Sequence, residues 1–370
     1  MKTEDPPSIT EAVKSLLSVN MGLKNEERLL VLGDSAGDVG ELAREFGTAA
    51  GNIHPGTETL VFDPVGGHGQ EPPRVVWERA LGPEAVGRLE NEALLSSLLS
   101  KEVTDTQLEA AAHLLTGFGE SAVDVVVAIT RFSTSHTSFR KLLTASCGVR
   151  YASMPHFTRD MFFGAMNVDW EQLAQGTNTL GRSLHGADSC EVRSPNGTRV
   201  SFEVSGRPVM VDDGILRKAG EFGNLPAGEV FIAPVEDTTE GTLVIEWGPL
   251  ARFPSPVTVR IEKGRAVSVS GEDRGSVQWL EDALAAHPEN SNVAELGIGT
   301  NPAATRPDNI LESEKILGTI HVAFGDNHTF GGTTVAPYHQ DFVVFNASLV
   351  AVWEKGGGRR VLLDNGQPGW

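Results

Sequence analysis

The stretch ERLLVLGDSAGDVGELAREFGTAAG, residues 27–51, decides the fold class of the first half of the chain. It opens with an uninterrupted apolar run, which predicts a buried strand, and glycines then lead into a helical pattern. The same order returns further on, where LVFDP (60–64) and DVVVAIT (124–130) predict strands and DTQLEAAAHLLTG (105–117) predicts a helix. Uninterrupted apolar strands that alternate with helices are typical of a parallel sheet. We therefore expect an α/β domain with a parallel sheet over residues 1–185.

The pattern changes in the second half. CEVRSPNGTRVSFEVSG (190–206) alternates apolar and polar residues around Asn196-Gly197, a strong signal for a β-hairpin. Further alternating runs follow, and one clear helix, SVQWLEDALAAH (276–287), interrupts them. We therefore expect residues 186–370 to form an α+β, strand-rich domain, and we assign the metal-binding, catalytic role to it.

The charge balance excludes some partners. The chain has 30 Lys and Arg residues against 49 Asp and Glu residues, which gives a formal net charge of −19. Because no basic stripe interrupts this acidity, we expect no nucleic-acid partner. No apolar run approaches the ~20 residues that a membrane span needs, so we expect no membrane association.

The N-terminus and the cysteines indicate a compartment. MKTEDPPSITEAVKSLL (1–17) has acids and prolines where a signal peptide has a basic start and an apolar core. The same region predicts a helix over residues 8–20 with Ser8 as its N-cap. Cys147 and Cys190 form no CxxC pair and fit reduced thiols. We expect a cytoplasmic protein.

Three histidines lie close together in the last quarter of the chain. His321, His328 and His339 fall within 19 residues and alternate with acids and glycines. In an extended strand His339 and Asp341 point to the same face, since side chains alternate with a period of two. An imidazole paired with a carboxylate suits zinc, manganese, cobalt or iron(II).

Three glutamates occur where partners for these histidines would be needed. Glu229 opens the apolar run EVFIAP, and Glu314 precedes ILGTIH. Glu295 lies in the apolar segment NVAELGIGTNP, where an unpaired acid is costly to bury. Taken singly, each of them is better explained as a solvated acid or a salt bridge than as a metal ligand.

Taken together, these segments resemble the metalloaminopeptidase family of aminopeptidases S and T. NLPAGEVFIAPVEDTTEGTLVIE, AELGIGTNP, LESEKILGTIHVAFGDNHTFGG and YHQD carry the resemblance, which extends over about residues 130–345. The resemblance implies a homodimer and two divalent metal ions, either zinc, cobalt or manganese. It implies the following metal ligands: Glu229, Glu295, Glu314, His321, His339 and Asp341.

The resemblance also implies an activity. It predicts a metal-dependent, aminopeptidase-like hydrolase that cleaves an amide or peptide bond of a peptide or small-molecule substrate through a metal-activated water. Glu295 or Glu229 is the candidate for moving the proton to the leaving amine. His328 stands where the family has a tyrosine, seven residues after His321, so we treat it as a third catalytic candidate and expect an unusual substrate range.

Two alternatives remain open. The ring-cleaving 2,5-dihydroxypyridine dioxygenases are similar to the same family and use one iron(II), for which His321, His339 and Asp341 would supply a facial set of ligands. The three glutamates favour the hydrolase, because an oxygen-rich cage for two metals suits hydrolysis. The other alternative is an acidic binding protein with a vestigial metal site.

Three further residues are candidates for binding substrate. His136 follows the strand at 124–130, at the edge where α/β domains bind ligands, and Arg140 would bind a carboxylate through two hydrogen bonds. Tyr338, next to the His-x-Asp pair, is the third candidate. The alternative for the loop is that Ser135 or Thr137 caps the next helix while His136 faces solvent.

Overall fold

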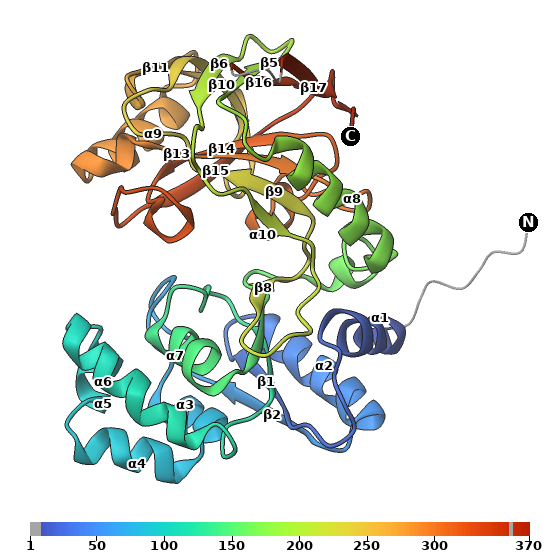
Figure 1. The fold of residues 1–370 in the computed structure, drawn as a ribbon, viewed down its shortest axis with the longest axis vertical. Coiled ribbons are helices and arrows are strands. Elements are labelled where there is room, and N and C mark those ends of the chain that lie inside the picture. Colours follow the sequence, from blue (N-terminus) through green and yellow to red (C-terminus); the bar gives the residue numbers. More distant parts are fainter. Residues whose placement is uncertain (1–8, 355–357) are drawn as a thin grey trace, which may run out of the picture. The chain divides into compact units, whose positions relative to one another are not determined.

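The computed structural model describes residues 9–354 and 358–370, which divide into two compact units (Figure 1). The N-terminal unit comprises the chain up to Trp170 together with Gly214–Pro226, and the C-terminal unit comprises Glu171–Asp213 together with Ala227–Trp370. The predicted N-cap Ser8 lies outside the described residues.

This division differs from a single boundary between residues 185 and 186. Helix α8 (Trp170–Leu184) precedes that boundary, yet its Leu180 and Leu184 pack in the core of the C-terminal unit. Conversely, strand β8 (Phe222–Asn224) follows it and pairs with β4 of the N-terminal unit. Each unit is therefore built from two separate segments of the chain.

The N-terminal unit contains a parallel sheet of five strands in the order β2-β1-β3-β4-β8. Its other strands are β1 (Leu29–Asp34), β2 (Thr57–Phe62), β3 (Val125–Ile129) and β4 (Arg150–Ser153). All residues of β1, β3 and β4 are buried, as expected for a parallel sheet covered by helices. The predicted α/β domain with a parallel sheet is confirmed.

Helices precede, connect and follow these strands. The helices of this unit are α1 (Ile9–Ser15), η1 (Leu16–Asn20), α2 (Val39–Ile53), α3 (Arg74–Leu81), α4 (Pro83–Asn91), α5 (Leu95–Ser100), α6 (Asp105–Leu115), η2 (Thr116–Phe118), α7 (Ser138–Cys147) and η3 (Arg159–Phe162). Helix α6 begins with a reciprocal capping box between Thr104 and Gln107, which satisfies two backbone N–H groups at its N-terminus.

The C-terminal unit contains two antiparallel sheets. The larger sheet, in the order β12-β11-β10-β6-β5-β16-β17-β18, consists of β5 (Ser189–Arg193), β6 (Arg199–Glu203), β10 (Glu240–Trp247), β11 (Arg252–Glu262), β12 (Arg265–Gly271), β16 (Ser348–Trp353), β17 (Gly358–Asp364) and β18 (Gln367–Pro368). The smaller sheet, in the order β15-β14-β13-β9-β7, consists of β7 (Met210–Asp212), β9 (Glu229–Ile232), β13 (Val293–Gly299), β14 (Ile320–Gly325) and β15 (His339–Val344). Besides α8, the helices of the C-terminal unit are α9 (Arg274–Ala285), η4 (Pro288–Ser291), α10 (Ile310–Ser313) and η5 (His328–Phe330).

The predicted strand-rich α+β domain is confirmed, and β5 and β6 form the hairpin expected around Asn196-Gly197. The two sheets share one apolar core, to which β6 gives Phe202 and β13 gives Leu296. Strands β13 and β14 are buried at every position. Any polar side chain that they carry must therefore find a partner inside the protein.

Among the described helices, none has the length and apolar character that crossing a membrane requires.

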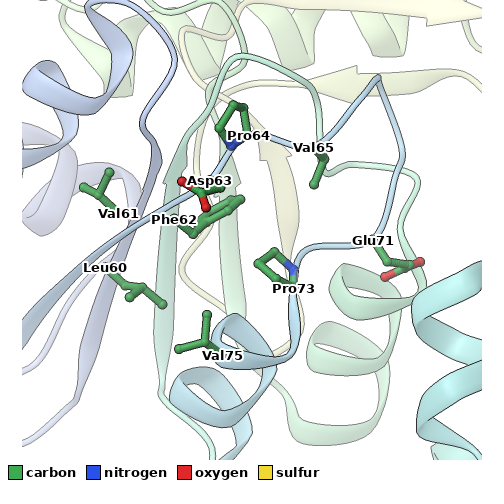
Figure 2. A pocket seen from close by; sticks show the side chains of 9 residues that line it. All are labelled: Leu60, Val61, Phe62, Asp63, Pro64, Val65, Glu71, Pro73 and Val75. Carbon is green, nitrogen blue, oxygen red and sulfur yellow. The ribbon is translucent and has the colours of Figure 1, made fainter.

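A loop after β2 is tied to the start of α7 by a buried acid. The Glu71 carboxylate accepts hydrogen bonds from the backbone N–H groups of Ser138 (2.5 Å) and Phe139 (3.0 Å). Glu71 also lines a hollow of about 560 Å³. Figure 2 shows it with the other lining residues, Leu60, Val61, Phe62, Asp63, Pro64, Val65, Pro73 and Val75. A carboxylate at this position satisfies N–H groups that have no partner within the helix.

Replacing this acid should destabilise the N-terminal unit. We expect Glu71→Ala to lower the free energy of unfolding by about 1–3 kcal/mol, because two buried N–H groups lose a charged acceptor. Glu109→Ala, which removes an exposed acid from α6, is the matched control and should change it by less than about 0.5 kcal/mol. Equal denaturant midpoints for the two variants would contradict this role of Glu71.

Candidate metal centre

Four neighbouring strands of the smaller sheet bring the predicted ligands onto one face. Glu229 lies opposite Gly299, and His321 lies opposite Gly297. Asp341 lies opposite Ala323, which is two residues from His321. Because paired residues share a face and side chains alternate along a strand, the residues with this parity all point to the same side. The predicted ligands among them are Glu229, Glu295, His321, His339 and Asp341.

The opposite face of the same strands is apolar. Leu296, Val322 and Phe342 have the other parity, and all three belong to the core of the C-terminal unit. The core thus fixes the register of the strands, since a slip by one residue would bury the acids in it. The ionisable face is a consequence of this register.

A glycine makes room for one histidine. A Cβ atom on Gly297 would lie 1.8 Å from Nε2 of His321, so the imidazole lies directly over this glycine. Any larger residue at position 297 would force the ring to move. The sequence carries this signal in the glycines that follow Glu295.

Glu295 is the carboxylate that the two histidines share. Its Oε1 atom is 3.1 Å from Nε2 of His321, and its Oε2 atom is 3.6 Å from Nε2 of His339. His321 Nε2 is also 3.4 Å from Oε2 of Glu229, and His339 Nε2 is 3.5 Å from Oδ2 of Asp341. Two groups with metal-ligand spacing result, Glu229–Glu295–His321 and Glu295–His339–Asp341.

His339 is oriented as a metal ligand. Its Nδ1 lies 2.7 Å from the backbone oxygen of Asp326, so Nδ1 carries a proton and donates it to this carbonyl. The other nitrogen, Nε2, faces Glu295 and Asp341. Such a bond to a carbonyl fixes the tautomer and the ring orientation of metal-binding histidines. Sequence reasoning missed this role of Asp326, and a backbone carbonyl leaves no signal in residue type.

Lys315 was also missed. Its side chain is completely buried, and its Nζ lies 3.0 Å from Oε1 of Glu229 and 2.5 Å from Oε2 of Glu314. Glu314 enters neither of the two groups described above, although it lies next to Asp341 as well as to Lys315. The signal in the sequence was a lysine placed directly between Glu314 and the mostly apolar run ILGTIH, where a buried charge must be paired.

The excess of carboxylates shifts the pKa values of both histidines. Burial lowers the pKa of His321, but the hydrogen bond to Glu295 and the charges of Glu229 and Asp341 outweigh burial and raise it to about 9. Desolvation likewise lowers the pKa of His339, and Asp341 and Glu295 raise it to about 10. In the absence of another cation, these pKa values favour the positively charged form of both imidazoles at neutral pH.

The acids respond in opposite ways. Burial raises the pKa of Glu295, and it raises that of Glu314 well above its usual range. Burial acts in the same direction on Asp341, but His339 and His321 outweigh it and hold the pKa of Asp341 well below its usual range.

The donor atoms fit a divalent cation. Oδ1 of Asp341 is buried without a hydrogen-bond partner in the part of the chain that the structure describes. Buried carboxylate oxygens of this kind are costly unless a cation compensates them. Oxygen and imidazole donors together suit a first-row transition metal.

Two other predicted residues of the C-terminal unit, His328 and Tyr338, belong to neither ligand group. His328 lies in η5, its side chain is 44% exposed, and Nδ1 lies 2.8 Å from the Asp326 carboxylate; it belongs to neither ligand group. Tyr338 has a buried hydroxyl without a hydrogen-bond partner in the described segments. Burial and the charge of Asp341 raise the pKa of Tyr338, so this hydroxyl stays protonated.

The two substrate-binding candidates of the N-terminal unit are His136 and Arg140. Arg140 donates from Nε to the backbone oxygen of Ser135 (2.7 Å), and its guanidinium lies 4.1 Å from the centre of the Phe222 ring. Thr137 caps α7 by accepting a hydrogen bond from the backbone N–H of Arg140. The capping alternative is therefore present, and His136 itself is exposed.

In comparisons with known proteins, the C-terminal half of the chain is similar in sequence to a dioxygenase. A family model described as NicX: 2,5-dihydroxypyridine 5,6-dioxygenase matches residues 165–351. The curated 2,5-dihydroxypyridine 5,6-dioxygenase of Pseudomonas putida is 26% identical over an alignment of 182 residues, and the alignment covers 45% of this chain and 51% of that protein. The chain thus matches about half the length of this relative.

Solved structures share the fold over the whole chain. The structure of 2,5-dihydroxypyridine dioxygenase from Pseudomonas putida has a TM-score of 0.69 at 18% identity and covers 98% of both chains. Wild-type AmpT from Thermus thermophilus has a TM-score of 0.60 at 16% identity, covering 98% of this chain and 99% of that one. At such identities the likeness shows the fold alone.

These findings correct the predicted activity. The expected metal-dependent hydrolase, a metalloprotease of the aminopeptidase type with two zinc, cobalt or manganese ions, is wrong, because the family model and the curated relative are both dioxygenases. The resemblance to aminopeptidases holds for the fold. The preference for hydrolysis rested on three free glutamates, and Lys315 pairs with two of them, Glu229 and Glu314.

The glycine beneath His321 provides a test of the centre. We expect Gly297→Ala to lower the affinity for a divalent ion about 10–100-fold, because the methyl group displaces the imidazole that supports Glu295. Gly51→Ala in α2, where an added Cβ meets open space, is the control and should leave the affinity unchanged. Equal dissociation constants for the two variants, measured by calorimetry, would separate His321 from metal binding.

Metal binding should release protons. Because the pKa values of His321 and His339 are raised to about 9 and about 10 and a metal binds neutral imidazole, protons compete with the ion below these values. The affinity should therefore rise with pH between about pH 6 and pH 8, with release of about one proton for each imidazole that loses its charge. Calorimetry in buffers of different ionisation enthalpy measures this release, and an affinity independent of pH would contradict it.

Proposed function

This chain belongs to the 2,5-dihydroxypyridine 5,6-dioxygenase family, whose model matches half of its length, and on that premise we propose that it is a mononuclear iron(II) ring-cleaving dioxygenase. The match at residues 165–351 carries the proposal, because it contains every strand of the candidate metal centre. The proposed substrate is a small hydroxylated aromatic or pyridine ring, with 2,5-dihydroxypyridine as the first compound to test.

Three side chains would hold the ion. Glu295, His339 and Asp341 have donor atoms within 4.8 Å of one another, and His339 already has the orientation of a ligand. This set differs from the expected His321, His339 and Asp341, because Glu295 stands between the two histidines. A bound iron(II) supplies the redox chemistry that lets dioxygen react with an electron-rich ring.

The neighbouring residues have distinct tasks in this proposal. The Asp326 carbonyl keeps the proton of His339 on Nδ1. His321 orients Glu295 through Nε2, and this pair holds a proton that can be exchanged with a substrate hydroxyl. Tyr338 offers a protonated hydroxyl that can donate a hydrogen bond to the substrate.

The expected homodimer stays a prediction, which light scattering of the purified protein tests. The small-molecule substrate and the lack of a nucleic-acid partner belong to the same proposal.

The activity can be tested directly. After chelation and anaerobic loading with iron(II), we expect the enzyme to consume dioxygen and 2,5-dihydroxypyridine in equal amounts, as an oxygen electrode and the loss of ring absorbance would measure. Zinc-loaded protein should be inactive, and leucyl anilides should not be hydrolysed. His339→Ala and Asp341→Asn should each lower turnover at least about 100-fold, because each removes a ligand.

The control for these variants is His185→Ala, which removes an exposed histidine of the same unit. It should keep the parental turnover. Full activity of Asp341→Asn, or metal-dependent amide hydrolysis without oxygen uptake, would refute the proposal.

A further inference from the structure

Lys315 is an unusual neighbour for a metal centre. Its side chain has no exposed surface, and its ammonium contacts one oxygen of each of two acids, Glu229 and Glu314. A lysine has a reference pKa of about 10.4 and three hydrogen-bond donors, so it acts here as a compact fixed cation.

The backbone around Lys315 is held on both sides. Its N–H donates to the oxygen of Glu312 (3.0 Å), and its own oxygen accepts from the N–H of Asn301 (2.8 Å). Glu312 is buried and accepts from the N–H groups of Thr305 (2.6 Å) and Arg306 (3.1 Å). The backbone of Lys315 is therefore held in place, and the ammonium itself is held by its two ion pairs with Glu229 and Glu314.

A second metal ion would need ligands that Lys315 already contacts. Two metal ions of one centre lie about 3.5–4 Å apart and share a carboxylate, which here would be Glu295. The second ion would then draw its other ligands from Glu229, Glu314 and His321, since Glu295, His339 and Asp341 form the other group. Lys315 stands between two of these three residues.

Lys315 also supplies positive charge at this place. Its ammonium faces the carboxylates of Glu229 and Glu314, and Asp212, which lies opposite Glu229 in the sheet, adds a third carboxylate whose charge acts on it. A cation is therefore already held where several acids converge.

We propose that the Lys315 ammonium occupies the position of a second metal ion and thereby limits this centre to one divalent ion. Glu229 and Glu314 are then partners of the lysine and are not metal ligands. Lys315 is a positioning residue that selects mononuclear chemistry on a fold with ligand types for two ions. The inference rests on the proposed function only in requiring that the centre binds metal.

Counting metal ions tests this inference without any measurement of activity. Purified, chelated full-length protein is titrated with manganese(II) by equilibrium dialysis and electron paramagnetic resonance. We expect the parent to bind one ion with the six-line signal of an isolated manganese. Lys315→Met, which keeps the length of the side chain and removes its charge, should bind two ions and lose most of that signal through coupling between them.

Two control variants separate charge from general damage. Lys315→Arg keeps the cation and should bind one ion. Lys218→Met, which removes an 87% exposed lysine, should behave as the parent. A single ion in Lys315→Met, bound with parental affinity, would overturn the inference, and so would two ions in the parent.

A second comparison does not depend on the folding of Lys315→Met. In the parent background, Glu229→Gln should keep one ion with an affinity lowered less than about tenfold, whereas Glu295→Gln should lose at least about 100-fold. Equal losses would make Glu229 a ligand and overturn the inference. A parent that binds no manganese and no iron would overturn both this inference and the proposed function, while one ion in every variant overturns the inference alone.

Discussion

Strands β13 and β14 are buried along their whole length, yet they carry the ionisable side chains of Glu295 and His321. A charge in such a place costs several kcal/mol unless other charges and hydrogen bonds compensate it. The other features of the centre compensate this buried charge. Glu295 contacts the imidazoles of both His321 and His339, whose raised pKa values favour their positively charged forms. The buried ammonium of Lys315 adds a further positive charge beside Glu229.

The fold provides the geometry for this compensation. One face of the smaller sheet is apolar and joins the core of the C-terminal unit, which sets the register of β9, β13, β14 and β15. The other face then collects five ionisable residues from strands that are distant in sequence. Gly297 is essential to the arrangement, because only a residue without a Cβ leaves room for the ring of His321.

Much of this was accessible from the sequence, for definite physical reasons. The apolar runs at 27–34 and 124–130 predicted parallel strands. Strands that are covered on both faces have apolar residues at successive positions, whereas strands with one exposed face alternate apolar and polar residues. The Asn196-Gly197 turn predicted the β5–β6 hairpin, since few other residue pairs adopt its backbone conformation. The residue types and their order also anticipated the set of side chains that the smaller sheet brings together.

What the sequence did not reveal depends on long-range contacts. Residues 214–226 return to the N-terminal unit to add β8, which no local pattern indicates. Asp326 acts through its carbonyl oxygen, so the identity of its side chain gives no signal. His328 looked like a member of the cluster by its spacing, but a turn directs it to Asp326 and to solvent.

The error over the reaction has a physical explanation of the same kind. Ligand types were counted as though each carboxylate were free, and three glutamates then indicated a cage for two metals. The relevant quantity is the number of carboxylates left after pairing with cations of the protein itself. Lys315 engages Glu229 and Glu314, so one glutamate, Glu295, stays with the His339–Asp341 pair. A lysine adjacent in sequence to a candidate ligand and followed by an apolar run should therefore be set against the candidate carboxylates before the number of metal ions is inferred.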